Sequence, residues 1–214
     1  ARNVFILRMN ADGTVKAEQQ LGKDLGGFIG PPYSLVSFGR SVASLGDFDG
    51  DGIGDLAVTD PPNWDLWILF LNADGTVKAE RKNRLTSARG QSLASLGDLD
   101  GDGITDLAVG EPDFGPDEGA VWITFLRADG GVRSTLRIGR NAGGFGALQP
   151  GDRFGSSLAA PGDLDGDGIT DLAVGASGND TGHLWILFLN ASGTVRATQR
   201  IDASNGGFCA VAIL

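Results

Sequence analysis

Short apolar runs recur along the chain, and residues that favour turns separate each run from the next. Three of the runs are strongly apolar and six or seven residues long, at Leu66–Leu71, Ala120–Leu126 and Leu184–Leu189. More polar runs follow at Val77–Arg81 and Val195–Ile201. Runs of this length, bounded by glycine, asparagine and aspartate, predict β-strands.

An acidic segment with the pattern Asp-x-Asp-Gly-Asp-Gly-Ile-x-Asp occurs three times. With their flanking residues, the copies run over Gly46–Val58, Gly97–Val109 and Gly162–Val174. Each copy follows a short run of small and apolar residues and continues directly into Leu-Ala-Val. Repetition of this kind indicates one structural unit that is used several times.

A second unit occurs four times and consists of an apolar run followed by Asn-Ala-Asp-Gly-Thr-Val-Lys or a close variant. Its copies lie at Asn10–Lys16, Asn72–Lys78, Arg127–Arg133 and Asn190–Arg196. The Ala-Asp-Gly tripeptide favours a tight turn, so the unit predicts a β-hairpin. Four short strands that recur about every 50–65 residues predict the blades of a propeller.

The predicted fold class is therefore all-β, a β-propeller or propeller segment built of four-stranded antiparallel blades. We expect about three full blades plus two half-blades: a half-blade at 1–25, blades at 26–83, 84–140 and 141–204, and the first strand of a composite blade at 205–214. The half-blades are expected to close on each other or on another chain. In the first case the apolar tail 210–214 would supply a strand beside Val4–Met9.

The composition narrows the class of protein. The chain has 214 residues and a net charge of −10, so it lacks the basic surface that nucleic-acid binding requires. Its 35 glycines argue against a helical bundle, because glycine inside a helix costs roughly 1 kcal/mol. No apolar run approaches the ~20 residues that cross a bilayer, which predicts no membrane span. Hydrophobic residues make up 41% of the chain, enough to build a core.

The acidic loops predict three calcium sites. Carboxylates about 4 Å apart repel one another by roughly 4 kcal/mol, so four of them require a cation nearby. Hard oxygen ligands at this density suit Ca²⁺, whereas Mg²⁺ demands a stricter octahedron. We expect the carboxylates at loop positions 1, 3, 5 and 9 and the carbonyl at position 7 to bind the ion. The expected ligands are Asp47, Asp49, Asp51, Ile53 and Asp55; Asp98, Asp100, Asp102, Ile104 and Asp106; and Asp163, Asp165, Asp167, Ile169 and Asp171.

An EF-hand and an ion-free turn are the two alternatives to this kind of site. An EF-hand needs a glutamate at position 12 and a following helix, but that position holds Val58, Val109 or Val174 inside a β-rich run. Solvated Asp/Gly turns without an ion would require the same spacing to arise three times by chance. The loops are therefore predicted to be strand-loop-strand calcium sites.

The residues around the loops resemble FG-GAP repeats, the blades of the integrin alpha-subunit propeller and of many bacterial surface proteins. The resemblance rests on Phe38-Gly39 and Phe154-Gly155 before the loops, and on Gly110-Glu111-Pro112 and Gly175-Ala176-Ser177 after them. It implies a calcium-stabilised propeller used for adhesion or assembly. The chain departs from the pattern at Arg89-Gly90, and it holds about half of the seven blades usual in the family.

The expected function is that of a non-enzymatic, calcium-binding propeller, extracellular or on the cell surface, which mediates adhesion or protein–protein interaction with a protein or glycan ligand. Calcium sites of this type are expected to fill at the concentrations found outside cells. One alternative is a structural subunit that assembles into a homo-oligomer, ring or filament through its end strands. A carbohydrate-binding or carbohydrate-active protein is a weaker alternative, because repeated equivalent acids suit structural ions better than the two distinct carboxylates of a glycosidase.

Several single residues attract attention. His183 is expected at a turn or strand edge, and Cys209, the only cysteine, is expected to be buried rather than reactive. Trp64 lies in a predicted loop and is the best candidate for an exposed contact residue. Three further tryptophans occupy one strand position in successive repeats, which predicts packing between blades rather than a sugar-binding platform: Trp67, Trp122 and Trp185.

Overall fold

The computed structural model describes residues 3–30, 37–85, 90–178 and 182–202. These residues form fourteen β-strands and one 3₁₀ turn, η1 (Pro61–Asn63). The strands make one two-stranded sheet and three four-stranded sheets, and every pairing is antiparallel. Within these ranges the chain forms no helix long and apolar enough to cross a membrane.

The strand bounds follow the repeats. The two-stranded sheet contains β1 (Val4–Met9) and β2 (Val15–Leu21). The next sheet contains β3 (Val42–Gly46), β4 (Asp55–Asp60), β5 (Asp65–Leu71) and β6 (Val77–Arg84). The third contains β7 (Ser92–Gly97), β8 (Asp106–Glu111), β9 (Ala120–Leu126) and β10 (Val132–Gly139). The fourth contains β11 (Phe154–Gly162), β12 (Asp171–Ala176), β13 (His183–Leu189) and β14 (Val195–Ile201).

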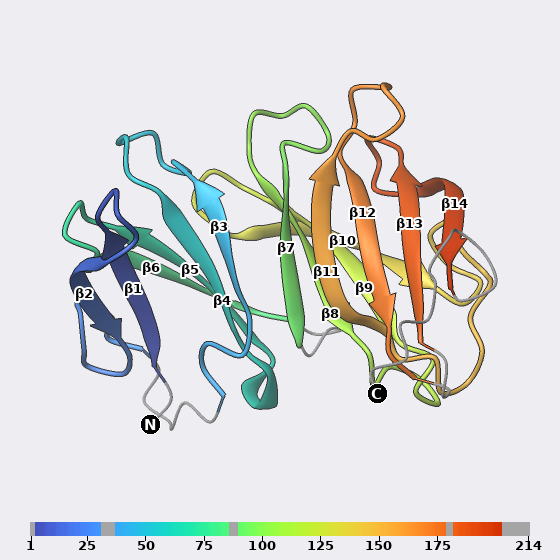
Figure 1. Cartoon of the computed structure of the whole chain (residues 1–214), viewed down its shortest axis with the longest axis horizontal. Helices are drawn as coiled ribbons and strands as arrows, with labels where there is room; N and C mark the ends of the chain where they lie inside the picture. The colour runs from blue at the N-terminus through green and yellow to red at the C-terminus, as the bar shows by residue number, and fades with distance from the viewer. Residues whose placement is uncertain (1–2, 31–36, 86–89, 179–181, 203–214) are drawn as a thin grey trace. The chain divides into compact units, whose positions relative to one another are not determined.

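Within each four-stranded sheet, the strands lie side by side in their sequence order, as β11 to β14 show (Figure 1). Four antiparallel strands in this order form the blade of a β-propeller, so the predicted fold class is confirmed. The fully buried strand β5 and the mostly exposed strand β6 also match the expected apolar and polar runs. The predicted strand at 205–214 lies outside the described residues.

The hairpin unit forms the same turn in all four sheets. In the turn before β6, the Asn72 amide donates to the Thr76 carbonyl at 2.8 Å, and the Gly75 amide donates to the Asn72 carbonyl at 2.8 Å. Gly75 has a φ of 87°, a backbone conformation that favours glycine. The Asp74 carboxylate closes the turn by accepting the Thr76 amide at 2.9 Å. The repeated Asn-x-x-Gly pattern therefore has a local structural cause.

The chain divides into two compact units, one of residues 1–90 and 127–131 and one of residues 91–126 and 132–214. In the first unit, the core contains Val4, Leu21 and Trp67, so β1 and β2 share it with β5. Phe38, from the Phe-Gly pair, stacks on Phe28 with ring centroids 4.8 Å apart, and the edge of Trp67 meets Phe28 at 5.0 Å. This aromatic triad explains why the Phe-Gly motif precedes the loop.

The second unit repeats the triad in its β11–β14 sheet. Phe154 stacks on Phe145 at 5.0 Å, and Trp185 meets Phe145 at 5.1 Å. The β7–β10 sheet has Arg89 where the others have phenylalanine, and its tryptophan behaves differently. Trp122 is half-buried, lies 5.9 Å from the Phe114 ring, and donates to Glu111 at 3.2 Å.

The predicted core role of the repeated tryptophans is thus confirmed for Trp67 and Trp185, while Trp122 contacts different residues and is only half-buried. His183 is the first residue of β13 and is half-buried, as expected for a strand edge. Trp64 follows η1 in a left-handed conformation with a φ of 60° and is only partly exposed. Cys209 lies outside the described residues.

Candidate metal centre

Each acidic loop connects the first two strands of its own sheet. The loop residue at position 9 begins the second of these strands, and it is fully buried in all three sheets, as Asp55, Asp106 and Asp171. The other three aspartates of each loop precede this strand. The loops therefore have one buried acid and three that are more accessible.

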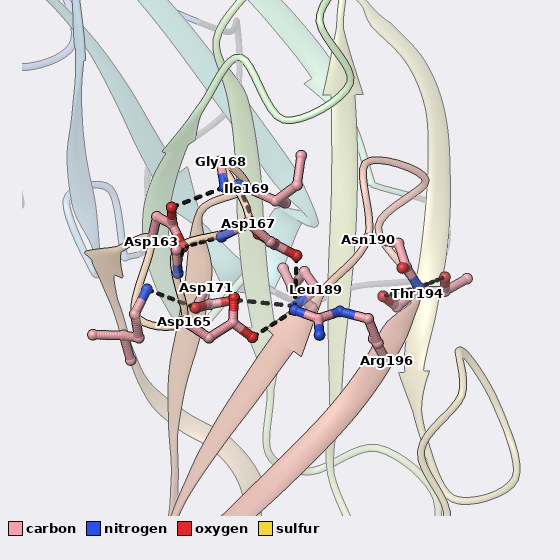
Figure 2. Close-up of polar contacts among 12 residues, drawn as sticks. Asp163, Asp165, Asp167, Gly168, Ile169, Asp171, Leu189, Asn190, Thr194 and Arg196 are labelled. Atoms are coloured by element: carbon pink, nitrogen blue, oxygen red, sulfur yellow. Dashed lines mark hydrogen bonds and ion pairs between the residues drawn. The ribbon is translucent and has the colours of Figure 1, made fainter.

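The buried aspartate ties the loop to the third strand of its sheet. In the fourth sheet, the Asp171 carboxylate accepts the Leu164 amide of the loop at 2.9 Å and the Leu189 amide at the end of β13 at 3.2 Å (Figure 2). Asp55 accepts the corresponding amides of Phe48 and Leu71. Asp106 repeats the pattern with two amides of its own sheet. The same carboxylate thus orients the loop and fixes its anchor point.

The loop backbone wraps around the carboxylate of the first loop aspartate and donates several amide hydrogen bonds to it. Asp163 accepts amides from Gly166 at 2.7 Å, Asp167 at 3.1 Å and Gly168 at 2.8 Å. These hydrogen bonds hold the pKa of the Asp163 carboxyl below its usual range, and the hydrogen bond from the Gly168 amide has the largest effect. A loop that points backbone amides at this carboxylate keeps it ionised and fixed in place.

Burial shifts the pKa in the opposite direction at two of the position 9 carboxylates, Asp55 and Asp106. It raises the pKa of Asp106 to about 6, against a usual value of 3.8, and two backbone amides oppose the rise. The pKa of Asp55 is also raised by burial. Neighbouring loop carboxylates push both values further upward. These groups therefore lack full compensation for their charge, and a nearby cation would supply it.

The carboxylates at positions 1, 3 and 9 converge in every loop. One oxygen from each lies within 4.8 Å of the others, in the trios Asp47, Asp49, Asp55; Asp98, Asp100, Asp106; and Asp163, Asp165, Asp171. Calcium binds oxygen at about 2.3–2.6 Å, so a single ion reaches oxygens separated by this distance. In addition, the buried Oδ1 of Asp100 has no hydrogen-bond partner within the described ranges. The donor set and the partnerless oxygen both fit a calcium ion.

The aspartates at position 5 do not belong to these trios. Asp51, Asp102 and Asp167 each accept the amide of the isoleucine two residues later and pair with a basic side chain. The isoleucine side chains of two loops, Ile53 and Ile169, are partly buried and pack against the hydrophobic core. Participation of position 5 and of the isoleucine carbonyls in metal binding stays a prediction.

The basic partners are functional candidates that the sequence reasoning missed. Lys78, Arg133 and Arg196 each lie next to the valine that begins the outermost strand, and each reaches the acidic loop of its own sheet. A signal was present, because all four copies of the hairpin unit end in lysine or arginine. Without the structure nothing connected that residue to the loop.

The FG-GAP repeat family matches the chain twice, at residues 89–124 and 154–187, which cover the second and third acidic loops with their flanking strands. The chain is an FG-GAP repeat protein. The first four-stranded sheet of this FG-GAP protein lies outside the two matched ranges, yet it carries the same loop, hairpin and aromatic triad.

Several integrin alpha subunits are similar to this FG-GAP protein. Integrin alpha-PS5 of Drosophila melanogaster is 35% identical over 197 residues, 84% of the chain and 18% of the relative. Integrin alpha-4 of Xenopus laevis is 33% identical over 205 residues, 86% of the chain and 18% of the relative. Integrin alpha-5 of Xenopus laevis is 47% identical over 168 residues, 67% of the chain and 15% of the relative. The chain thus spans less than a fifth of the length of these relatives.

Proposed function

We propose that this chain is a non-enzymatic, extracellular or cell-surface segment of a calcium-binding β-propeller, which mediates adhesion or protein–protein interaction. One observation carries the proposal: three loops of the same construction each bring three carboxylate oxygens within 4.8 Å of one another. Similarity to integrin alpha subunits supports the adhesive role and the location. The acids form three equivalent sets, whereas a glycosidase needs two carboxylates in distinct environments. The ligand is proposed to be a protein or a glycan.

We expect three calcium ions, one in each loop. In the first loop the ligands are the carboxylates of Asp47, Asp49, Asp51 and Asp55 and the carbonyl of Ile53, and the other loops use the matching residues. When bound, calcium cancels the repulsion among these carboxylates. The buried Asp55 holds the loop against β5, because its carboxylate accepts the Leu71 amide at 2.9 Å. Ion binding at this carboxylate is therefore coupled to the stability of the sheet.

Removal of calcium should lower the melting temperature strongly. An ion that binds only the folded state at 100 times its dissociation constant adds about 2.7 kcal/mol of stability. Thermal melts of the full chain in millimolar calcium and in excess chelator measure the difference. The exposed turn variant Asp74→Asn serves as a control with an intact response to calcium. An unchanged melting temperature in chelator would rule out structural calcium sites.

The ligand assignment has its own test. Asp165→Ala removes one carboxylate from the third trio and leaves the first two trios intact. Isothermal titration calorimetry should then report two filled sites of unchanged affinity and a third that is much weaker. Three equivalent sites in this variant would contradict the proposed role of Asp165.

A second candidate function is self-association through the outer face of the β1–β2 sheet. Phe5 and Leu7 on β1 are 55% and 49% exposed, although the matching residues of β5, Trp67 and Leu69, are 3% and 0% exposed. Met9 on the same face is exposed as well. On β13, the apolar side chains on the face opposite its tryptophan are only half-buried, whereas the matching side chains of β5 are buried.

The proposed occupant of this face is the β13 face of a second copy. The precedent lies within the first unit, where β5 packs its tryptophan face against the inner side of β1 and β2. Light scattering after size exclusion should show a concentration-dependent oligomer, and Leu7→Asp should return it to the monomer. A strict monomer at high concentration would eliminate this candidate and leave the calcium proposal intact.

A further inference from the structure

A single-residue β-bulge follows the turn of every hairpin unit. At the start of β6, Val77 pairs with Leu71 and Ala79 pairs with Phe70, so Lys78 is the extra residue. The same shift occurs at the start of β2, β10 and β14. The extra residue is basic in all four strands: Lys16, Lys78, Arg133 and Arg196. Bulges change the direction of a side chain, and here each one redirects a positive charge.

In the three sheets that contain an acidic loop, the bulge residue reaches that loop. The Lys78 ammonium lies 2.8 Å from an oxygen of Asp49 and also pairs with Asp51. The Arg133 guanidinium lies 2.6 Å from Asp102 and also pairs with Asp100. Each cation therefore contacts the aspartates at loop positions 3 and 5.

The third loop shows the arrangement in Figure 2. The Arg196 side chain extends from β14 beneath the loop, and one guanidinium nitrogen lies 2.5 Å from Asp165 and 2.7 Å from Asp167. Asp165 at position 3 also belongs to the carboxylate trio with Asp163 and Asp171. The bulge residue and a metal ion would therefore share the position 3 carboxylate.

We propose that Lys78, Arg133 and Arg196 are built-in counter-ions that set the calcium affinity of their own loops. The inference rests on the proposed calcium function and adds to it a competing group on each sheet. In the calcium-free loop, the cation offsets repulsion between the carboxylates at positions 3 and 5. In the calcium-bound loop, the same side chain repels the divalent ion and competes with it for the carboxylate at position 3.

The consequence is a lower affinity for calcium and a loop that keeps its form without the ion. Ion pairs as exposed as these contribute little to folding by themselves, so the effect should appear in ion binding rather than in overall stability. Removing a positive charge a few ångströms from a divalent ion should tighten binding about 3- to 20-fold, depending on salt.

The two-stranded sheet provides an internal control. Lys16 occupies the same bulge position on β2, but the connection from β1 to β2 is a hairpin turn and no acidic loop belongs to that sheet. A change of Lys16 removes the same charge from the same kind of strand position. It should therefore leave calcium binding unaltered.

The test uses calcium titrations of the full chain by calorimetry. The triple variant Lys78→Met, Arg133→Met and Arg196→Met keeps side chains of similar length and removes the three charges, so all sites shift together. It should bind calcium about 3- to 20-fold more tightly than the wild type, with a difference that shrinks at high salt. Lys16→Met should match the wild type, and Lys78→Arg should keep its affinity within about twofold.

Unchanged or weaker binding in the triple variant would overturn the inference. If the triple variant fails to fold in chelator, the three single variants replace it, and each should tighten one site out of three. A wild-type chain that binds no calcium at all would instead overturn the proposed function. The two failures are thus told apart by the wild-type titration.

Discussion

The buried aspartate at loop position 9 should stabilise the fold even without calcium, and Asp171→Ala tests this. Asp171 is fully buried, and its carboxylate accepts the amides of Leu164 and Leu189. Alanine leaves both amides without an acceptor. The matched variant is Asp163→Ala, in the same loop, because the amides that Asp163 binds are exposed and water can replace its carboxylate.

The magnitudes follow from the burial of the lost bonds. The Leu189 amide is buried and costs about 1–3 kcal/mol when it is left unpaired, whereas the Leu164 amide is only partly buried and costs less. Asp171→Ala should therefore lose about 1–5 kcal/mol in chelator. For a chain of this size that loss corresponds to a melting temperature lower by roughly 2–20 °C. Asp163→Ala should lose less than about 1 kcal/mol under the same conditions. In calcium, both variants should lose a further contribution of about 2.7 kcal/mol from one ion.

The assay is thermal unfolding followed by circular dichroism, for the wild type and both variants, in excess chelator and in millimolar calcium. The reasoning requires a difference between the variants in chelator and a similar loss for both on going from calcium to chelator. Equal melting temperatures of the two variants in chelator would refute it, because the position 9 carboxylate would then act only as a metal ligand.

Two further predictions concern the packing around the loops. Phe154→Ala should cost about 3–5 kcal/mol in urea denaturation, because the ring is fully buried against Phe145. The control Ile29→Ala changes an exposed side chain and should cost under about 0.5 kcal/mol. Equal costs for the two variants would contradict the core assignment. Gly144→Ala should destabilise by more than the ~1–2 kcal/mol of backbone strain, since its φ is 81° and a Cβ would lie 2.4 Å from the Val195 carbonyl oxygen. Gly13 has a φ of 85° and open space around it, so Gly13→Ala should show the effect of backbone strain alone. If Gly144→Ala destabilises the protein no more than Gly13→Ala does, the close approach to the carbonyl oxygen is unimportant.

The comparison of Trp67 with Trp122 shows where sequence reasoning reaches its limit. Both occupy the same position in their repeats, and the repeat alone predicts the same surroundings. Trp67 meets Phe28 in the core, but Trp122 meets Phe114 and bonds to Glu111. Trp67 is buried, whereas Trp122 is only half-buried. Both the contacts and the burial of a side chain depend on residues that are distant in the sequence, so the local pattern predicts the strand position but not the surroundings.

The sequence by itself determined the strands, the hairpin turns and the three acidic loops, because these depend on residues a few positions apart. Asn72 and Gly75 close their turn locally, and the alternation of apolar runs with glycine and aspartate marks where strands begin. The tertiary structure alone decided which groups meet across a sheet. Asp171 reaches the Leu189 amide, and Arg196 reaches Asp165, only because strands separated by many residues pair in one register and a bulge redirects one side chain.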